Sequence, residues 1–475
     1  MRSAIALGFC LIACGEGTRA AAPDAGTAGD ATRASAAPSV PTLDTTPSFA
    51  PVAEMGPSDA RRVSVAVADD DRVAVTWTTV GTPVTGHAFF ADEARGFTPE
   101  HLAAALDGLC SSPTVALSAG GKAIVAFQVV QSSEGRVMIA TRENRSERLR
   151  APTGLNDSIS LPGLHAYEPV AFATPDGEQL VVWNQWRGTG FSIALADRPA
   201  GGAWQLPKGT QDLLSYPIFH SNGPRPVISD AGAVVVSWHQ SPGAGDMMVW
   251  VSERARRDQP MSRPGPTDFI STPGVRASSG IFANSRPALA ADGRAAVGWT
   301  QDTGPGDFAR VFVAVRAAGA TFQRGMPVAT VSDPDATASN VHPFFIGATL
   351  HVIWEEELAS GARRVVFARQ EGSGWSRPAA ISPAGLRAAA ATVGVGPRTV
   401  VAWAEGTTDG YRVMARVFGS DGSLGRPIEI SPPTSEVSDV SAAVGSGKDS
   451  RVAIAWTHRG LVGSHVRVVA TRRSD

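Results

Sequence analysis

Four ionisable residues each stand directly before a proline that opens a short apolar segment. They are Glu168, Arg225, Arg286 and His342, and Arg387 lies near the start of a further such segment. A guanidinium can hold a carboxylate through two parallel hydrogen bonds, which a lysine ammonium does not reproduce. If the apolar segments are neighbouring strands, the ionisable side chains gather at one end of them. The sequence therefore predicts a ligand-binding site formed by Arg225, Arg286, His342 and Glu168.

Catalysis would need further groups, and the sequence offers few of them. Tyr167 adjoins Glu168, and the other tyrosines are Tyr216 and Tyr411. No two histidines have the spacing of zinc ligands, and the Gly-x-Ser-x-Gly motif of serine hydrolases does not occur. We assign no catalytic residue and expect neither a metal nor another cofactor.

Three further motifs have simpler explanations than a site. The carboxylate runs Asp69–Asp71 and Glu355–Glu357 could hold Ca²⁺ through their oxygens, but solvated turns also account for them, and we expect turns. Segment Val444–Lys448 resembles a phosphate-binding loop. Ala442 stands where the first glycine of that loop is needed, and strand-like segments flank it, so we expect no nucleotide there.

The cysteines exclude a disulfide framework. Cys10 and Cys14 lie in the first fourteen residues, which leaves Cys110 alone in the rest of the chain. A catalytic thiol would need a histidine partner, and His101 is the one histidine nearby. We expect Cys110 to be a half-buried structural thiol.

Opposite charges nearly balance, with 42 basic and 44 acidic residues and a formal net charge of −2. A nucleic-acid-binding protein would carry a basic patch or an excess of positive charge. We therefore expect no nucleic-acid partner, and we expect a monomer.

An alternating apolar segment that ends in an aromatic residue recurs through the chain and would position these side chains. Neighbouring aromatics are 49 to 61 residues apart, a period typical of β-propellers. The aromatics are Trp77, Phe127, Trp183, Trp238, Trp299, Trp354, Trp403 and Trp456. A short strand and a Gly- or Asp-containing turn precede each segment, and another strand follows it. The repeat predicts an all-β fold, a propeller of eight blades with three to four antiparallel strands each; seven blades remain an alternative.

The sequence carries four further expectations about the blades. The recurring aromatic is expected to wedge between neighbouring sheets as core. The polar residue two places after it, such as Gln185 or Glu405, is expected to satisfy loop backbone, with a polar ring on one rim as the alternative. Residues 98–108 predict a helix capped by Thr98 and ended by Gly108. The last unit shows three strands, so closure needs a strand from the N-terminal side, for which residues 47–52 are a candidate.

The blade pattern resembles the sialidase-like propellers, including bacterial repeat-containing surface proteins. The shared features are the Pro-led strand, the small turn, the Val-Val-x-Trp strand and a glycine-led Trp in the last segment, as at Gly374-Trp375. The Asp-box of that family, Ser-x-Asp-x-Gly-x-Thr-Trp, survives only as remnants such as Ser420-Asp-Gly422. The resemblance implies glycan binding, or else a glycoside hydrolase or lyase that acts at the mouth of the central channel.

The N-terminus has the pattern of an export signal. Arg2 precedes an apolar run that ends in Leu11-Ile12-Ala13-Cys14-Gly15, and the run is shorter than the roughly 20 residues that span a bilayer. It resembles the lipobox of bacterial lipoproteins, which implies cleavage before Cys14 and lipidation of Cys14. An ordinary secretory peptide is the alternative. In that family an Asp after the cysteine favours the inner membrane, so Gly15 implies the outer membrane or the cell surface.

Composition divides the chain into three parts. Residues 1–13 are the expected signal peptide. Residues 14–58 are rich in Ala, Gly, Pro, Thr and Ser and predict a disordered tether behind the lipid. Residues 59–475 contain the repeat and form the expected propeller. Together these features predict a membrane-anchored, non-catalytic propeller of the cell envelope that binds a protein or a glycan.

Overall fold

The computed structural model describes residues 49–50, 53–55, 59–80, 86–103, 106, 108–217, 219–241, 247–272, 285–302, 308–383, 388–434, 436–447, 450–459 and 463–471. All the described strands belong to one compact unit, residues 41–475. None of the described residues forms a helix long and apolar enough to cross a membrane.

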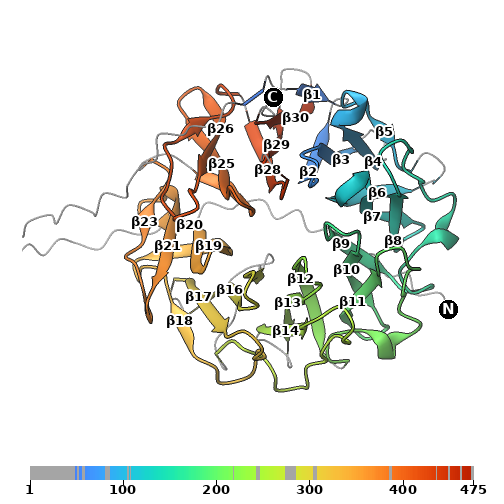
Figure 1. Ribbon diagram of the computed structural model, residues 1–475, viewed down its shortest axis with the longest axis horizontal. Helices are drawn as coiled ribbons and strands as arrows, with labels where there is room; N and C mark the ends of the chain where they lie inside the picture. Colours follow the sequence, from blue (N-terminus) through green and yellow to red (C-terminus); the bar gives the residue numbers. More distant parts are fainter. Residues whose placement is uncertain are drawn as a thin grey trace, which may run out of the picture. The chain divides into compact units, whose positions relative to one another are not determined.

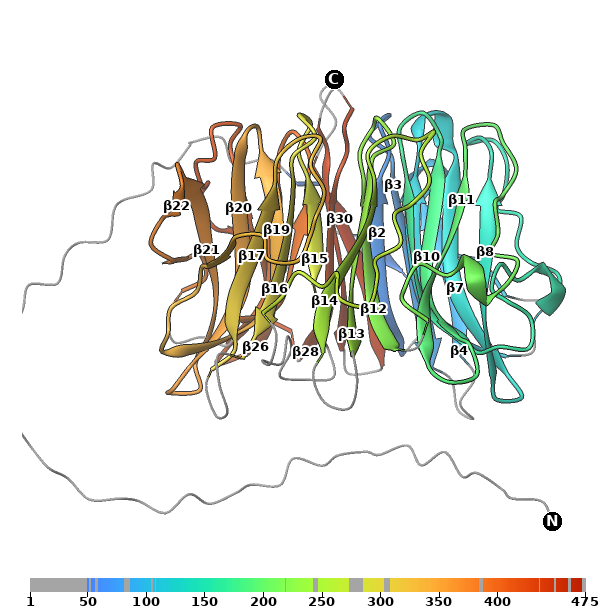
Figure 2. The same cartoon turned by 90° about the horizontal axis from the view of Figure 1, so that it is seen from below.

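The strands form eight antiparallel sheets that follow one another around a ring (Figure 1). In Figure 1, β2 (Ala60–Val67), β12 (His220–Ile228) and β28 (Glu436–Val444) lie near the centre of the ring, and the other strands of their blades lie progressively outward. Figure 2 shows the strands of all blades running between the same two faces. The fold is therefore an eight-bladed β-propeller, as the aromatic repeat predicts, and the seven-bladed alternative is excluded.

The first four blades follow the chain from blue to green in Figure 1. Blade 1 is β2 (Ala60–Val67), β3 (Val73–Val80), β4 (Gly86–Asp92) and β5 (Glu100–His101). Blade 2 is β6 (Leu109–Leu117), β7 (Ala123–Gln131) and β8 (Glu134–Arg142). Blade 3 is β9 (Ala166–Ala173), β10 (Gln179–Trp186) and β11 (Phe191–Arg198). Blade 4 is β12 (His220–Ile228), β13 (Val234–Ser241) and β14 (Met248–Arg254).

Blades 5 to 7, like blade 1, have one or two outer strands beyond the first three. Blade 5 is β15 (Arg286–Leu289), β16 (Ala295–Gln301), β17 (Arg310–Arg316) and β18 (Val328–Thr330). Blade 6 is β19 (Ala336–Ile346), β20 (Thr349–Leu358), β21 (Arg363–Glu371), β22 (Gly374–Trp375) and β23 (Ala379–Ala380). Blade 7 is β24 (Ala388–Gly394), β25 (Val400–Thr407), β26 (Gly410–Val417) and β27 (Ile428–Glu429).

Blade 8 joins the two ends of the chain. It contains β28 (Glu436–Val444), β29 (Val452–Arg459) and β30 (Ser464–Ala470), and the N-terminal strand β1 (Ala53–Met55) completes it by pairing with β30. Phe49 adds a single bridge to Thr471. Closure from the N-terminal side is thus confirmed. The paired strand follows the expected segment 47–52 instead of coinciding with it.

The recurring aromatic residue is core in every blade. All seven tryptophans of the series and Phe127 have 0% of their surface exposed. Each aromatic sits on the second strand of its blade among apolar side chains of two blades; Trp354, for example, packs with residues of blades 5 and 6. Burying so large a side chain between blades supplies much of the stabilising apolar contact.

The polar residue two places after the aromatic satisfies buried groups at the strand end. The Nε1 of Trp183, Trp238 and Trp299 donates to the side-chain oxygen of Gln185, Gln240 and Gln301, in each case over 3.0 Å. The amides of the glutamines in turn donate to loop carbonyls, as Gln240 does to Tyr216 over 2.8 Å. The structural interpretation is confirmed for Gln185, Gln240 and Gln301. It does not extend to Glu356, which pairs with Arg364, and the Nε1 of Trp354 and of Trp456 has no hydrogen-bond partner among the described residues.

A serine fixes the last segment of six blades to the third strand, a feature that the sequence analysis did not find. Its hydroxyl accepts a hydrogen bond of 2.9–3.1 Å from a buried backbone N–H of the third strand. The preceding apolar residue donates its own N–H back to the third strand over 2.7–3.0 Å. The serines are Ser160, Ser215, Ser271, Ser332, Ser382 and Ser431. Each follows an aliphatic residue and precedes a proline by one or two places, so a sequence signal for this clamp exists.

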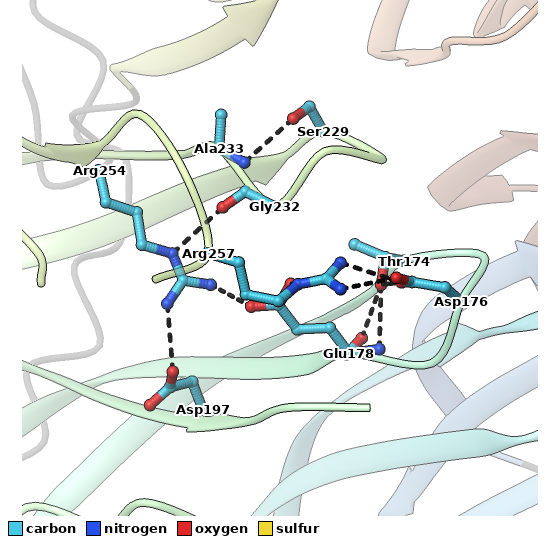
Figure 3. Close-up of polar contacts among 9 residues, drawn as sticks. All are labelled: Thr174, Asp176, Glu178, Asp197, Ser229, Gly232, Ala233, Arg254 and Arg257. Carbon is cyan, nitrogen blue, oxygen red and sulfur yellow. Dashed lines mark hydrogen bonds and ion pairs between the residues drawn. The ribbon is translucent and has the colours of Figure 1, made fainter. Parts of the chain in front are cut away.

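Arginines at the end of the third strand connect neighbouring blades. Arg142, Arg198, Arg254 and Arg316 are the last residues of β8, β11, β14 and β17, and each pairs with a carboxylate at the corresponding end of the preceding blade. Figure 3 shows the Arg254 example. The Arg254 guanidinium contacts Asp197 over 3.1 Å, the buried Glu178 and the carbonyl oxygen of Gly232.

The helix expected over residues 98–108 is absent from the part of that segment that the structure describes. Glu100 and His101 form strand β5 and pair with Phe90 and Phe89 of β4. Leu102 is then buried against the blade with 1% exposure. Addition of an edge strand buries this apolar residue, and that contribution outweighs the local capping signals from which the helix was predicted.

Candidate ligand-binding site

The innermost strands carry a recurring β-bulge. In blades 1–4, 6 and 7, two residues of the first strand lie opposite the single core aromatic of the second strand. The first bulge residue has a positive φ of 49–63° in five of these blades; these residues are Arg62, Ser112, Glu168, Gly223 and Asn340. A non-glycine residue in this conformation costs about 1–2 kcal/mol, and such positions concentrate at functional sites. The bulge redirects the side chains around it.

Three of the sequence-predicted residues occupy one equivalent position beside this bulge. Arg225 on β12 pairs with Ser237, Arg286 on β15 with Gly298, and His342 on β19 with Ile353. Each partner directly precedes a core tryptophan. Consecutive blades 4, 5 and 6 therefore present two guanidiniums and an imidazole at the same level of the ring.

Glu168 does not share that position. It is the first residue of the bulge on β9, and Val170, opposite Val182, holds the place equivalent to Arg225. The proline pattern hid this difference, because Pro169 is the second bulge residue whereas Pro226 follows the bulge. We refer to Glu168, Arg225, Arg286 and His342 as the inner cluster.

Charge effects connect Glu168 with Arg225, and Arg225 with Arg286 and His342. Burial lowers the pKa of Arg225, and the nearby Glu168 opposes this. Burial also lowers the pKa of Arg286, and the charge of Arg225 lowers it further. Burial, with both guanidiniums, holds the pKa of His342 well below its ordinary value. At neutral pH the cluster therefore presents two guanidinium cations and a neutral imidazole.

Two carboxylates in or near the inner cluster, those of Glu355 and Glu168, accept hydrogen bonds from uncharged groups. Glu355 accepts hydrogen bonds from the Nδ2 of Asn340 over 2.6 Å and from the backbone N–H of Ala391 over 2.9 Å. Glu168 accepts one from the Nδ2 of Asn184 over 3.2 Å. The half-buried Arg286 has a buried Nε without a hydrogen-bond partner among the described residues. Hydrogen-bonding capacity for an incoming acceptor therefore remains at Arg286.

Tyr167 is not prepared to act as a nucleophile. Burial raises the pKa of its phenol, and the neighbouring Glu168 raises it further. The ring packs edge-on against Phe191 with the centroids 4.6 Å apart. The phenol is therefore protonated at neutral pH, and attack through its oxygen would depend on a general base that removes the proton.

The two carboxylate runs differ. Asp69 and Asp70 lie in a turn, as expected, whereas Glu355–Glu357 lies on strand β20 with Glu356 0% exposed, so the solvated turn expected there is wrong. Glu356 and Glu357 pair with the cross-strand Arg364 and Arg363, over 2.6 and 2.7 Å. Asp70 pairs with Arg72 over 2.8 Å. Within the described residues no group of three or more His, Cys, Asp or Glu side chains is arranged to hold a metal ion.

Cys110 is more deeply buried than expected. It is 3% exposed within the core of blades 1 and 2, and burial raises the pKa of its thiol to about 11. It is a structural thiol because almost none of it ionises near neutral pH.

Several sequence-predicted features lie outside the described residues. These are the signal peptide, Cys14, the tether up to residue 48, Arg387 and Lys448.

Comparisons with known proteins concern architecture alone. No family model matches the chain, and no curated protein matches its sequence. Polysaccharide lyase Uly1 matches with 10% identity, a TM-score of 0.46 and coverage of 86% of this chain and 89% of the lyase. A subtype N11 neuraminidase-like protein of A/flat-faced bat/Peru/033/2010 (H18N11) matches with 8% identity, a TM-score of 0.37 and coverage of 92% and 98%. The Aleuria aurantia lectin, a six-bladed propeller, matches with 12% identity, a TM-score of 0.34 and coverage of 65% and 92%. At these values no functional residue is transferred from them to this chain.

Proposed function

We propose that the inner cluster binds an acidic group, a carboxylate or a sulfate, of a glycan. The observation that carries the proposal is the pair of half-buried guanidiniums on adjacent blades, with the buried Nε of Arg286 lacking a partner among the described residues. Desolvated like charges repel, and an anion between them relieves that repulsion. A guanidinium also matches the planar geometry of a carboxylate through two hydrogen bonds.

The half-buried setting favours a small anionic group over the flat surface of a protein. A carboxylate or sulfate on a sugar ring can reach a recessed guanidinium without a large complementary interface. His342 adds no third positive charge to this setting, because it is neutral, and its Nε2 is held by the Oδ1 of Asn340 over 3.0 Å.

The test is isothermal titration calorimetry with sialyllactose, a hyaluronan tetrasaccharide and a chondroitin 4-sulfate tetrasaccharide, with maltotetraose as the neutral probe. At least one acidic probe should bind, and Arg225→Gln and Arg286→Gln should each weaken its binding at least tenfold, about 1.4 kcal/mol. Arg256→Gln is the matched control, because that guanidinium is 68% exposed and lies outside the cluster. Equal affinity for maltotetraose, or unchanged binding by both inner variants, would contradict the proposal.

We propose binding without turnover, in agreement with the raised pKa of Tyr167. Fluorogenic sialosides and uronides incubated with the protein should give no product above background. Turnover that disappears in Arg225→Ala and Arg286→Ala would instead establish the glycoside hydrolase or lyase alternative.

We also propose that a lipid on Cys14 anchors the propeller at the bacterial cell envelope, with the outer membrane or cell surface as the location. The support is the lipobox pattern of residues 11–15. A palmitate analogue should label the wild-type protein in cells and fail to label Cys14→Ala. Labelling that persists in the variant would refute the anchor.

A further inference from the structure

We infer that a group of half-exposed aromatic rings on blades 3 and 4 is a second subsite, which stacks a sugar ring adjacent to the acidic group held by the inner cluster. The group, called the aromatic cluster below, consists of His165, Tyr167, Trp186, Phe191 and His220. The inference rests on the proposed function and specifies its ligand as an oligosaccharide longer than one unit.

The rings converge from separate elements. Phe191 at the start of β11 is the hub, with ring centroids 4.6 Å from Tyr167 on β9, 4.9 Å from Trp186 on β10 and 5.4 Å from His220 on β12. His165 completes the group 6.3 Å from Tyr167. The backbone supports this convergence, because the N–H of Trp186 donates to the carbonyl oxygen of His165 over 2.6 Å. The cluster therefore belongs to the ordered end of the blade.

Trp186 is not explained by the propeller repeat. Trp183, three residues earlier, fills the core position of this blade and is 0% exposed. In the other seven blades the residue three places after the core aromatic is never aromatic: Val80, Val130, Ser241, Asp302, Glu357, Gly406 and Arg459. Blade 3 thus carries an additional tryptophan at the solvent-facing end of its second strand, where the core does not need it.

The cluster keeps contact with solvent. Trp186, Phe191, Tyr167 and His165 are half-buried, and His220 is exposed. Polar atoms border the rings: the Nη1 of Arg187 donates to the hydroxyl of Thr189 over 2.8 Å, and its Nη2 donates to the carbonyl of Phe219 over 3.2 Å. Rigid aromatic faces with polar atoms at their edges suit a sugar, whose ring has an apolar C–H face and a polar rim.

The aromatic cluster and the inner cluster meet in the sequence and in space. Tyr167 is covalently bonded to Glu168, and Asn184, two residues before Trp186 on β10, donates through its Nδ2 to Glu168 over 3.2 Å. The charge of Glu168 also acts on Arg225. A saccharide chain can therefore place its acidic group at Arg225 and Arg286 and stack the neighbouring ring on Trp186 or Tyr167. A free monosaccharide acid can occupy the inner cluster alone.

The experiment compares two chain lengths of one chemistry, glucuronic acid and the hyaluronan tetrasaccharide, by isothermal titration calorimetry. The wild-type protein should bind the tetrasaccharide at least tenfold more tightly than the monosaccharide. Trp186→Ala should remove most of that gain and leave glucuronic acid binding within twofold. Trp186→Tyr should restore part of the gain, because it returns an aromatic face. Trp375→Ala is the matched control, because Trp375 is a half-buried tryptophan of blade 6.

The outcomes separate this inference from the proposed function. Arg286→Gln should weaken binding of both probes, whereas Trp186→Ala should weaken only the longer one. Equal affinity for the two chain lengths, or tetrasaccharide binding that Trp186→Ala leaves unchanged, would refute the aromatic subsite while the inner cluster stands. If neither probe binds, the subsite for a glucuronate-containing chain is refuted, whereas the proposed function is decided separately by sialyllactose and the chondroitin 4-sulfate tetrasaccharide.

Discussion

At the scale of single residues, buried histidines link the stability of the propeller to pH. His351 is 1% exposed on β20 and stacks on Phe344 with centroids 5.5 Å apart. Burial lowers its pKa from 6.5 to about 4, although a hydrogen bond with the carbonyl of Thr349 opposes the shift. His342 is shifted in the same direction. In the unfolded chain both imidazoles return to their ordinary pKa.

The free energy of unfolding should therefore fall as the pH drops below 6.5. Between pH 6.5 and about 4 the unfolded chain takes up a proton at His351 that the folded chain does not, which favours the unfolded state. His351 alone should cost roughly 3 kcal/mol across this interval, at about 1.4 kcal/mol per pH unit. Urea denaturation at several pH values measures the effect, and His351→Phe should flatten the curve. An identical pH dependence in the variant would show that His351 is not its source.

The residue-level expectations succeeded where local spacing decides the contact. Gln185, Gln240 and Gln301 each lie two residues after a tryptophan on the same strand. This spacing alone puts the two side chains on the same face. Glu405 has the same spacing but also pairs with Arg412 across the hairpin, over 2.6 Å. Glu168 was wrongly aligned with Arg225, because the sequence does not show where the bulge inserts its additional residue. Register, unlike spacing, depends on the partner strand.

At the scale of elements, ion pairs at the strand ends hold neighbouring blades together. Arg254 ends β14 and contacts Asp197 and Glu178 of blade 3 (Figure 3). Both Arg254 and Glu178 are nearly inaccessible to water, with side-chain exposures of 4% and 1%. Removal of one partner from a buried pair leaves a charge without compensation, which is far costlier than the loss of an exposed pair.

Arg254→Met should lower the free energy of unfolding by about 3 kcal/mol, because Glu178 then keeps only its contact with Arg257. Arg256→Met is the control two residues away, where Arg256 and Asp258 are 68% and 73% exposed. That change should cost less than about 0.5 kcal/mol. Guanidinium chloride denaturation provides both values. Similar losses in the two variants would mean that the buried connection between blades is not stabilising.

The elements differ in how well the sequence predicts them. The strands beside each core aromatic follow from alternation of apolar residues, a local property. The expected helix at residues 98–108 failed because its caps are local, whereas burial of Leu102 depends on the neighbouring strand β4. The serine clamp was readable as an aliphatic–Ser pair followed by Pro. The role of this pair could not be predicted from the sequence, because it depends on the third strand: the hydroxyl of Ser271 accepts a hydrogen bond from the N–H of Val249, 22 residues away.

At the scale of the whole molecule, the ring is closed by a strand of three residues. β1 pairs Ala53, Glu54 and Met55 with Val468, Arg467 and Val466 of β30. Glu54 also contacts Arg467 over 2.9 Å, and Met55 is 5% exposed. The number of blades followed from the aromatic spacing, and the need for such a strand followed from the three visible strands of the last unit. The location of β1 could not be predicted, because a strand of three residues is too short to show an apolar alternation.

Removal of β1 should weaken the whole propeller. A chain that begins at residue 41 should unfold at the same temperature as the full-length protein, and a chain that begins at residue 59 should unfold several degrees lower. The shorter chain loses the burial of Met55 and leaves the edge of β30 unpaired. Differential scanning calorimetry gives the midpoints, and limited trypsin digestion should cut first at Arg467 in the shorter chain. Equal midpoints and equal digestion patterns would show that β1 does not stabilise closure.

The bridge between Phe49 and Thr471 places the two ends of the folded unit next to each other. A short linker between them would make the backbone continuous, and new termini could then be opened in an exposed loop of another blade. Such a circular permutant keeps all four strands of blade 8 in one uninterrupted segment. The same adjacency means that the chain enters and leaves the folded unit beside blade 8.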